Sequence, residues 1–266
     1  MGFERAKAAL AGGRFADLRW VATTGSTNED VRDLVARLPG DAAPVVLVAD
    51  HQSAGRGRLE RSWEAPPGSS ILMTVGLPAG GIALRHRTLV SVALALAVTD
   101  AVPQLALKWP NDLVVPVAGD PLGYRKAGGI LTEAHDVSGT PWLLVGLGLN
   151  VDWPELPAEL ADTATSLDRV LGHPVDREDL VVAILAGFGE RWLPMLEDPD
   201  RVGGLLGAFR ARTTTIGRRV RVVLPGGELE GLATDLREDG SLVVADDRGA
   251  EHVVTAGDVV HLRPAT

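Results

Sequence analysis

The chain has 266 residues, of which 45% are hydrophobic and 23% charged, and this length suffices for one large and one small domain with buried cores. It contains no cysteine, which excludes disulfides, thiolate metal sites and catalysis through a cysteine thioester. The formal net charge of −9 argues against a broad nucleic-acid-binding face, which needs a surplus of basic residues. No apolar stretch approaches the roughly 20 residues of a membrane span, and the polar amino-terminus is unlike a signal peptide. We therefore expect a soluble, cytoplasmic protein.

The amino-terminal part of the sequence predicts a strand, a helix and a second strand. Residues 18–22 form a short apolar run, and a helical pattern follows Ser26-Thr27-Asn28-Glu29, which has the form of a capping box. The continuous apolar run 45–49 predicts a strand that leads to Gln52, and residues 71–77 predict the next strand. The segment between these two strands is therefore a connecting loop.

This loop contains the most informative motif, Gly55-Arg56-Gly57-Arg58-Leu59-Glu60-Arg61-Ser62-Trp63, which we call the arginine loop. Glycine allows the backbone N–H groups to approach a ligand, and arginine offers a planar set of donors that fits phosphate or carboxylate. The motif alone is also compatible with a solvated basic loop or an RNA-binding tract. Because the whole chain is acidic, we interpret the loop as a clamp for one small anion.

The rest of the chain predicts helices and strands in alternation. Residues 84–102 predict a long buried helix, and strands follow at 105–109, 113–117, 127–134 and 142–151. Asp176 is expected to cap a helix over 177–196, and a further helix is expected over 199–212. Five short strands at 220–224, 228–234, 242–245, 251–255 and 259–262 then suggest a small barrel.

Three further motifs carry polar or glycine residues where predicted strands meet turns. Lys108-Trp109-Pro110-Asn111-Asp112 presents Asn111 and Asp112 at a turn, although Pro-Asn-Asp is also ordinary turn chemistry. Lys126 precedes Gly128-Gly129, a pattern that also fits an edge-strand lysine beside a bulge. Gly146, Gly148 and Asn150 share one face of a strand and leave a bare strip for a flat ligand. The chain has none of the common nucleotide or zinc-hydrolase motifs, and its histidines lack metal-ligand spacing.

Taken in order, Ser26-Thr27-Asn28, Gln52, the arginine loop, Lys-Trp-Pro-Asn-Asp and the two glycine motifs resemble the biotin protein ligases. The resemblance covers about residues 18–155, and the hairpin-rich tail is similar to the carboxyl-terminal domain of that family. It implies an α+β fold with a class II aminoacyl-tRNA synthetase-like catalytic domain, a mixed sheet flanked by helices, at 1–214. It also implies a small SH3-like β-barrel at 215–266. Few residues precede the motifs, so we expect the short form without an amino-terminal DNA-binding domain.

The resemblance also implies the chemistry and the residues that perform it. Biotin and ATP form biotinyl-5'-adenylate with the help of Mg²⁺, and the biotinyl group then passes to a lysine of the biotin carboxyl carrier domain of an acyl-CoA carboxylase. Arg58 and Lys126 are the expected catalytic residues. The residues expected to bind biotin are Ser26, Thr27, Asn28, Gln52, Gly55, Arg56, Gly57, Arg58, Lys126, Gly129 and Gly148. Those expected to bind ATP or the adenylate are Arg58, Arg61, Trp63, Asn111, Lys126 and Asn150, with Asp112 as the candidate metal ligand.

Two other functions compete with this interpretation. A lipoate–protein ligase of the same superfamily uses the same adenylation chemistry, although the arginine loop and Lys-Trp-Pro-Asn-Asp favour biotin. A non-catalytic module that binds a small anion is the other alternative. We expect no bound transition metal, no DNA or membrane partner, and either a monomer or a weak homodimer.

Overall fold

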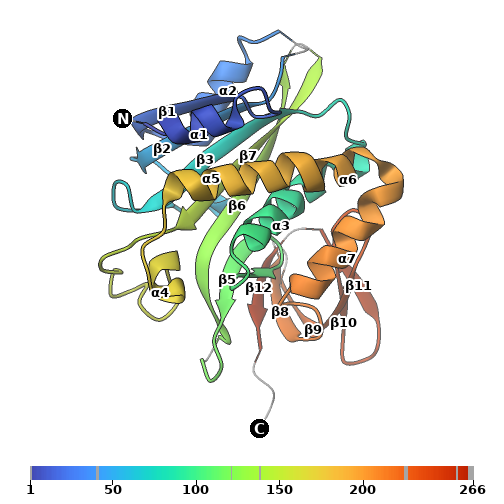
Figure 1. The fold of residues 1–266 in the computed structure, drawn as a ribbon. Helices are drawn as coiled ribbons and strands as arrows, with labels where there is room; N and C mark the ends of the chain where they lie inside the picture. The colour runs from blue at the N-terminus through green and yellow to red at the C-terminus, as the bar shows by residue number, and fades with distance from the viewer. Residues whose placement is uncertain are drawn as a thin grey trace.

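The computed structural model describes residues 2–39, 42–120, 122–137, 139–224, 227–255 and 257–262. Its largest element is a sheet with the strand order β1-β2-β3-β7-β6-β5-β4 (Figure 1). The strands are β1 (Asp17–Thr24), β2 (Val45–Gln52), β3 (Ser70–Pro78), β4 (Ala106–Lys108), β5 (Asp112–Pro116), β6 (Tyr124–Val137) and β7 (Thr140–Asn150). Strands β1 and β2 are parallel, whereas the other neighbours are antiparallel. The predicted mixed sheet is thus confirmed, together with each of its strands.

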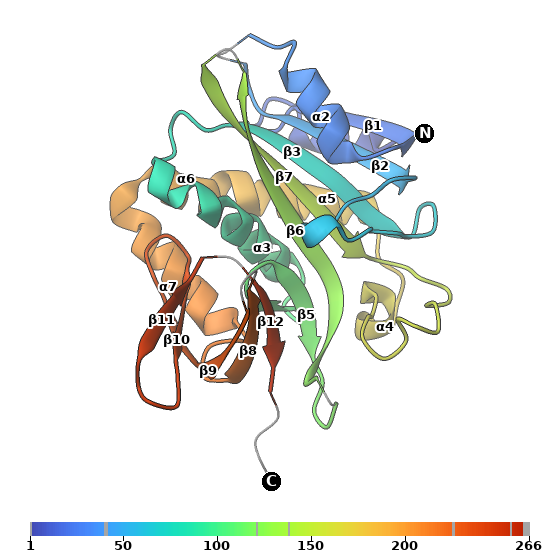
Figure 2. The same cartoon turned by 180° about the vertical axis from the view of Figure 1, so that it is seen from behind.

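Helices cover the two faces of this sheet unequally. The helices α1 (Glu4–Leu10), α3 (Val90–Ala101) and α5 (Arg177–Gly187) pack on one face and share the main apolar core with it. The other face carries α2 (Thr27–Val35), which packs on β2, β3 and β7 over a small core that includes Trp142 and Leu144. Figure 2 shows that α2 covers only one end of its face and leaves much of β6 and β7 open. The open part of this face is where the candidate site lies.

The helical segments differ from the prediction where the helix type changes. The predicted helix 84–102 begins as a 3₁₀-helix, Leu84–Leu89, and becomes α-helical only in α3. The predicted helix 177–196 consists of α5, a π-helical segment Phe188–Trp192 and α6 (Leu193–Glu197). Pro194 lies in the first turn of α6 and has no N–H for an intrahelical hydrogen bond, which accounts for the change of winding before it. The spacing of apolar residues identifies a buried helix but does not distinguish α-helical, 3₁₀-helical and π-helical segments.

Other differences concern short helices and helix ends. The sequence analysis missed α1 and α4 (Leu167–Leu171), which are too short to give a clear periodic signal. A single 3₁₀ turn, Pro199–Arg201, precedes α7 (Val202–Arg212) in the predicted helix 199–212. Ser26 does occupy the N-cap position of α2, but its hydroxyl makes no capping hydrogen bond. The predicted capping box is therefore wrong, whereas the predicted cap by Asp176 on α5 is confirmed.

The carboxyl-terminal segment forms a second, antiparallel sheet with the order β11-β10-β9-β8-β12. Its strands are β8 (Arg219–Leu224), β9 (Gly227–Leu236), β10 (Leu242–Ala245), β11 (Glu251–Val254) and β12 (Asp258–His261), as predicted. Trp109 joins this sheet to the large one, because its ring N–H donates to the Gly240 carbonyl at 3.0 Å and its backbone N–H to Thr215 at 3.0 Å. The last four residues of the predicted second domain, 263–266, lie outside the described residues. Among the helices described, none is long and apolar enough to cross a membrane.

Candidate active site

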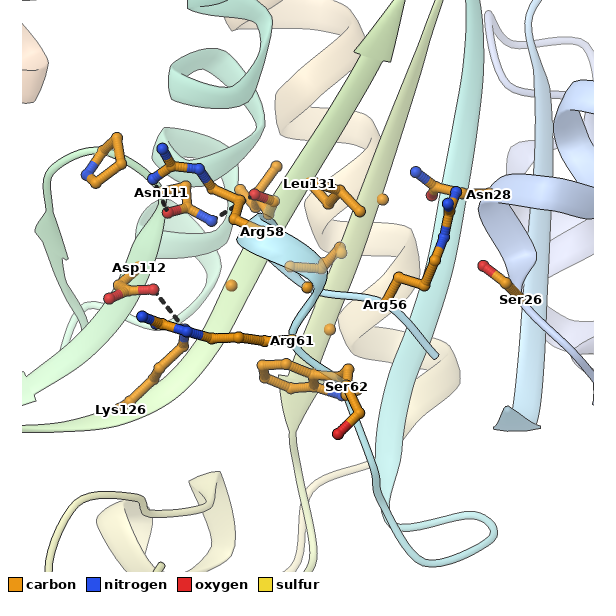
Figure 3. A pocket seen from close by; sticks show the side chains of 18 of the residues that line it. Ser26, Asn28, Arg56, Arg58, Arg61, Ser62, Asn111, Asp112, Lys126 and Leu131 are labelled. Carbon is orange, nitrogen blue, oxygen red and sulfur yellow. Dashed lines mark hydrogen bonds and ion pairs between the residues drawn. The ribbon is translucent and has the colours of Figure 1, made fainter. Parts of the chain in front are cut away.

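A pocket lies on the open face of the large sheet, beside the beginning of α2 and under the arginine loop (Figure 3). Its floor consists of glycines on β6 and β7, where Gly129 pairs with Gly148. A Cβ atom at Gly146 would lie 2.3 Å from Asn28 Oδ1, and one at Gly148 would lie 2.6 Å from the Trp63 ring. Both positions require glycine, because any side chain there would displace a group that lines the pocket. The predicted bare strip is real, and side chains of the protein itself lie on it.

One end of the pocket, which we call the polar end, is built by the start of α2. The backbone N–H of Thr27 donates to Gln52 Oε1 at 2.8 Å, and the Thr27 hydroxyl lies 2.9 Å from the same oxygen. The buried hydroxyl of Thr74 lies 2.8 Å from Thr27 Oγ1 and 2.6 Å from Asn28 Oδ1. Asn28 in turn donates to the Glu133 carboxylate at 2.7 Å. A continuous hydrogen-bond network thus connects β2, β3, α2 and β6.

Within the arginine loop, the Arg56 side chain lies at the polar end, apart from Arg58 and Arg61. Its guanidinium donates to Glu133 Oε1 at 3.0 Å and lies 3.8 Å from Glu29. Figure 3 shows the Arg56 side chain directed toward Asn28, on the opposite side of the pocket from Arg58 and Arg61. Two carboxylates therefore more than compensate the charge of Arg56, so the polar end has no surplus of positive charge.

The opposite end, which we call the cationic end, contains two lysines that share one carboxylate. Lys126 Nζ lies 2.5 Å from Asp112 Oδ1, and Lys108 Nζ lies 3.3 Å from Asp112 Oδ2. Burial lowers the pKa of Lys108 despite the nearby carboxylate of Asp112. Burial alone would raise the pKa of Asp112, but the ammonium groups of Lys126 and Lys108 more than offset this and hold its pKa below the ordinary value. Two lysines share this one carboxylate, so the group carries a net positive charge when both lysines are protonated.

Arg58 and Arg61 add to the charge of the cationic end. Arg58 Nη1 donates to Asn111 Oδ1 at 3.2 Å, and Asn111 is itself fixed by a 2.7 Å hydrogen bond to the Ile130 carbonyl. Arg61 forms an ion pair with Asp258, a residue of β12 that also lines the pocket. Four cationic side chains thus face two carboxylates, an arrangement suited to anionic groups such as phosphates.

Trp63 ends the arginine loop and lies on the glycine floor. Lys126 Nζ is 5.7 Å from the centre of its ring, within the range of a cation–π contact. The indole N–H is buried and has no hydrogen-bond partner among the described residues. The ring therefore covers a surface on which a flat ligand group could lie instead.

The pocket brings together most of the residues that the sequence predicts. The predicted residues that line it are Ser26, Thr27, Asn28, Gln52, Arg56, Gly57, Arg58, Arg61, Trp63, Asn111, Asp112, Lys126, Gly129 and Gly148. Gly55 and Asn150 are not among its lining residues. Gly55 instead supports the arginine loop, where its carbonyl accepts from the Trp63 N–H at 2.8 Å, and the Asn150 amide donates to the Thr165 carbonyl at 3.1 Å.

Several residues of the site were not predicted. Lys108 belongs to a motif that the sequence analysis singled out, but only its turn residues were assigned a role. Glu133 lies on the same face of β6 as Gly129, so strand alternation could have identified it. Thr74 and Asp258 lie on β3 and β12 and carry no local motif. Within the described ranges no cluster of three or more acidic or histidine side chains could hold a metal ion by itself.

Two family profiles match separate parts of the chain. The profile described as "Biotin/lipoate A/B protein ligase family" matches residues 22–150, and that described as "Biotin protein ligase C terminal domain" matches residues 215–262. The chain is 38% identical over 265 residues to the biotin–[acetyl-CoA-carboxylase] ligase of Mycobacterium tuberculosis, covering 95% of this chain and 92% of that protein. It is 30% identical to the enzyme of the same name from Paracoccus denitrificans, covering 90% and 98% of the two chains.

A solved structure agrees with these sequence matches. The biotin protein ligase from Aquifex aeolicus in complex with biotin and ATP has 25% sequence identity to this chain and superposes with a TM-score of 0.76. The superposition covers 94% of this chain and all of the other chain. The two proteins thus share the same fold over nearly the whole of both chains.

Proposed function

The chain belongs to the biotin protein ligase family, and we propose that its pocket holds biotin with the ureido ring at the polar end and the carboxylate toward the cationic end. The protein is an ATP-dependent ligase that attaches biotin to a protein. The observation that supports this orientation is the separation of charge along one pocket. Arg56 is compensated by carboxylates at one end, whereas Arg58, Arg61, Lys108 and Lys126 gather at the other.

In the first reaction, a carboxylate oxygen of biotin attacks the α-phosphorus of ATP and the bond to pyrophosphate breaks. Two anions must meet in this step, so cations that are already in place lower its barrier. Lys126 and Arg58 would neutralise the charge that develops on the α-phosphate, and Arg61 would contact the remaining phosphates. Asp112 lies where it could help to hold Mg²⁺, an ion that needs only one or two carboxylates when phosphates supply its other ligands. When bound, Mg²⁺ would neutralise phosphate charge.

In the second reaction, the amine of the acceptor lysine attacks the carbonyl carbon of biotinyl-5'-adenylate and AMP leaves. The acceptor would be the biotin carboxyl carrier domain of an acyl-CoA carboxylase, since relatives are named for this activity. No side chain of the ligase becomes covalently modified. The arginine loop would keep water away from the reactive anhydride until the acceptor arrives.

Both predicted domains would contribute to the pocket in which the two reactions take place. Residues 1–214 would bind biotin and ATP in a fold related to class II aminoacyl-tRNA synthetases, and residues 215–266 would form an SH3-like barrel that supplies Asp258 to the pocket. The contacts of Asp258 and Trp109 across the two sheets support a joint role.

The experiment that tests the function is AMP and pyrophosphate release from ATP in the presence of biotin, lipoate or octanoate, with a biotin carboxyl carrier domain as acceptor. We expect release with biotin alone. Release with lipoate in its place would identify a lipoate–protein ligase. If none of the three acids released AMP, the pocket would belong to a non-catalytic binding module.

A further inference from the structure

We propose that Glu133, which does not line the pocket, is a positioning residue that orients the hydrogen-bond network of the polar end so that this end accepts N–H donors from the ligand. The inference rests on the placement of biotin proposed above. Glu133 follows Gly129 and Leu131 on the same face of β6, so one strand reaches from the cationic end at Lys126 to the polar end. Its two oxygens accept from Arg56 at 3.0 Å and from Asn28 at 2.7 Å.

The carboxylate of Glu133 fixes the direction of each hydrogen bond that follows it. An ionised carboxylate only accepts, so the amide NH₂ of Asn28 must point toward Glu133 and its carbonyl oxygen toward Thr74. The Thr74 hydroxyl, 2.6 Å from that carbonyl, must then donate its single proton to it. The Thr27 hydroxyl then has no proton to accept from Thr74 and donates its own, either to Thr74 Oγ1 at 2.8 Å or to Gln52 Oε1 at 2.9 Å.

Gln52 Oε1 also accepts from the Thr27 backbone N–H at 2.8 Å, so in this network Thr27 Oγ1 only donates and keeps its lone pairs, and Gln52 Oε1 keeps a lone pair whenever the Thr27 hydroxyl donates to Thr74. Both residues line the pocket, so their free lone pairs are available to a ligand there. The ureido ring of biotin has two N–H donors that would satisfy these acceptors. A dithiolane ring or an alkyl chain has none, and a site built for N–H groups rejects a ligand that leaves its buried acceptors unpaired. Glu133 would thus impose selectivity from outside the pocket.

Glu133 also controls where the ligand carboxylate goes. A free Arg56 guanidinium at the polar end would attract the carboxylate of biotin and favour a reversed orientation. The ion pair with Glu133 at 3.0 Å removes this attraction, and the more distant Glu29 at 3.8 Å adds to the effect. The uncompensated cations then lie only at the opposite end.

The test measures steady-state pyrophosphate release in Glu133→Ala and Glu133→Gln, with biotin varied at saturating ATP and ATP varied at saturating biotin. We expect the KM for biotin to rise roughly ten- to a hundredfold, the effect of losing hydrogen bonds to a charged group, while kcat and the KM for ATP stay unchanged. Gln has the shape of Glu but adds an NH₂ group that lets the network reverse. Glu133→Gln should therefore restore the KM for biotin if Glu133 acts through its shape alone. It should leave the KM raised if Glu133 orients the network.

Two further variants complete the test. Glu29→Gln removes the more distant carboxylate near Arg56 without changing the partners of Asn28, so we expect a smaller rise in the KM for biotin than in Glu133→Gln. Thr74→Val interrupts the same network at the next hydrogen bond. In the double variant with Glu133→Ala, the KM for biotin should therefore rise by less than the product of the two single effects. Multiplicative effects, rescue by Glu133→Gln, or a fall in kcat with the KM for biotin unchanged would overturn the proposal. Failure of the wild-type protein to release pyrophosphate with biotin would instead overturn the proposed function.

Discussion

Arg61 and Asp258 form an ion pair although 197 positions of sequence separate them. The pair ties the arginine loop to β12, so the small sheet holds one side of the pocket. Arg58 adds a second tie, because its guanidinium donates to the Gly257 carbonyl at 3.4 Å. The position of the loop therefore depends on both sheets.

Asp258→Ala should loosen the arginine loop in the ligand-free protein. The Arg61 side chain is well exposed, and exposed ion pairs stabilise by about 0.2 to 1 kcal/mol, so we expect amide hydrogen exchange across 55–61 to accelerate by at most about fivefold. Asp247→Ala breaks a comparable exposed pair with Arg219 in the same sheet and should leave the loop unchanged. Equal exchange in wild type and Asp258→Ala would show that the pair does not restrain the loop.

Lys126→Ala and Lys126→Met should nearly abolish adenylate formation without unfolding the protein. Lys126 is only partly buried and lines the pocket, so its loss removes a charge from the reaction and little from the core. Loss of one such group at a developing oxyanion costs about 10² to 10³ in rate. Biotin-dependent pyrophosphate release measures the effect, and Lys7→Met is the control because Lys7 pairs with Glu4 on the surface. Wild-type rates in either Lys126 variant would exclude the assigned role.

Arg58→Gly should weaken retention of biotinyl-5'-adenylate more than its synthesis. Arg58 lies where it could pair with the adenylate phosphate, and one charged hydrogen bond is worth about 1.5 to 3 kcal/mol, so escape of the intermediate should rise roughly ten- to a hundredfold. Labelling of lysines on an added bystander protein measures this escape. Arg58→Lys keeps the charge and should release less. If labelling stayed confined to the carrier domain while synthesis continued, Arg58 would not be the retaining group.

Gly148→Ala should impair the enzyme because the added methyl group would lie 2.6 Å from the Trp63 ring and would project into the floor of the pocket. Overpacking of this kind costs about 1 to 3 kcal/mol, which corresponds to roughly 5- to 100-fold in kcat/KM for biotin. Gly80→Ala is the matched control, since no atom lies within 4 Å of a Cβ atom at that position. Comparable kcat/KM values for the two variants would contradict the assignment of this strip as a binding surface.

His261 should make folding stability depend on pH. Burial lowers the pKa of His261 to about 4, so between about 6.5 and 4 the unfolded chain binds a proton that the folded protein does not, and stability falls as pH falls through this window. The full shift in pKa would correspond to a loss of about 3 kcal/mol in the free energy of unfolding. Because the ring keeps some contact with solvent, we expect a loss of about 1 to 2 kcal/mol. Urea unfolding of wild type and His261→Gln at pH 7 and pH 4.5 measures this difference. A surface variant, His173→Gln, should retain the wild-type dependence.

The local motifs predicted the fold and most of the pocket because each carries its own physical signal. Pro110 indicates the turn that presents Asn111, the glycines near Lys126 indicate an open floor, and the glycines of the arginine loop indicate a connection between two strands. These signals do not depend on distant parts of the chain.

The residues that the sequence analysis missed act through partners that are remote in sequence. Glu133 meets Arg56 across 77 positions, and Thr74 meets Asn28 across 46 positions, so neither contact leaves a local pattern. Asn150 illustrates the reverse case. Strand alternation places it in line with Gly146 and Gly148, but its amide is directed to Thr165 at the end of the strip. Strand alternation identifies the face on which a side chain lies but not the residue that the side chain contacts.

The shared carboxylate of Asp112 has a consequence for the integrity of the enzyme itself. The product of the first reaction is an acylating agent for amines, and only unprotonated amines are nucleophilic. The chain has three lysines, Lys7, Lys108 and Lys126, and two of them lie in the pocket where this agent forms. Burial favours the neutral form of Lys108, whereas its contact with Asp112 favours the ammonium form. By favouring the ammonium form of Lys108, the contact with Asp112 would oppose biotinylation of this lysine by the reactive adenylate.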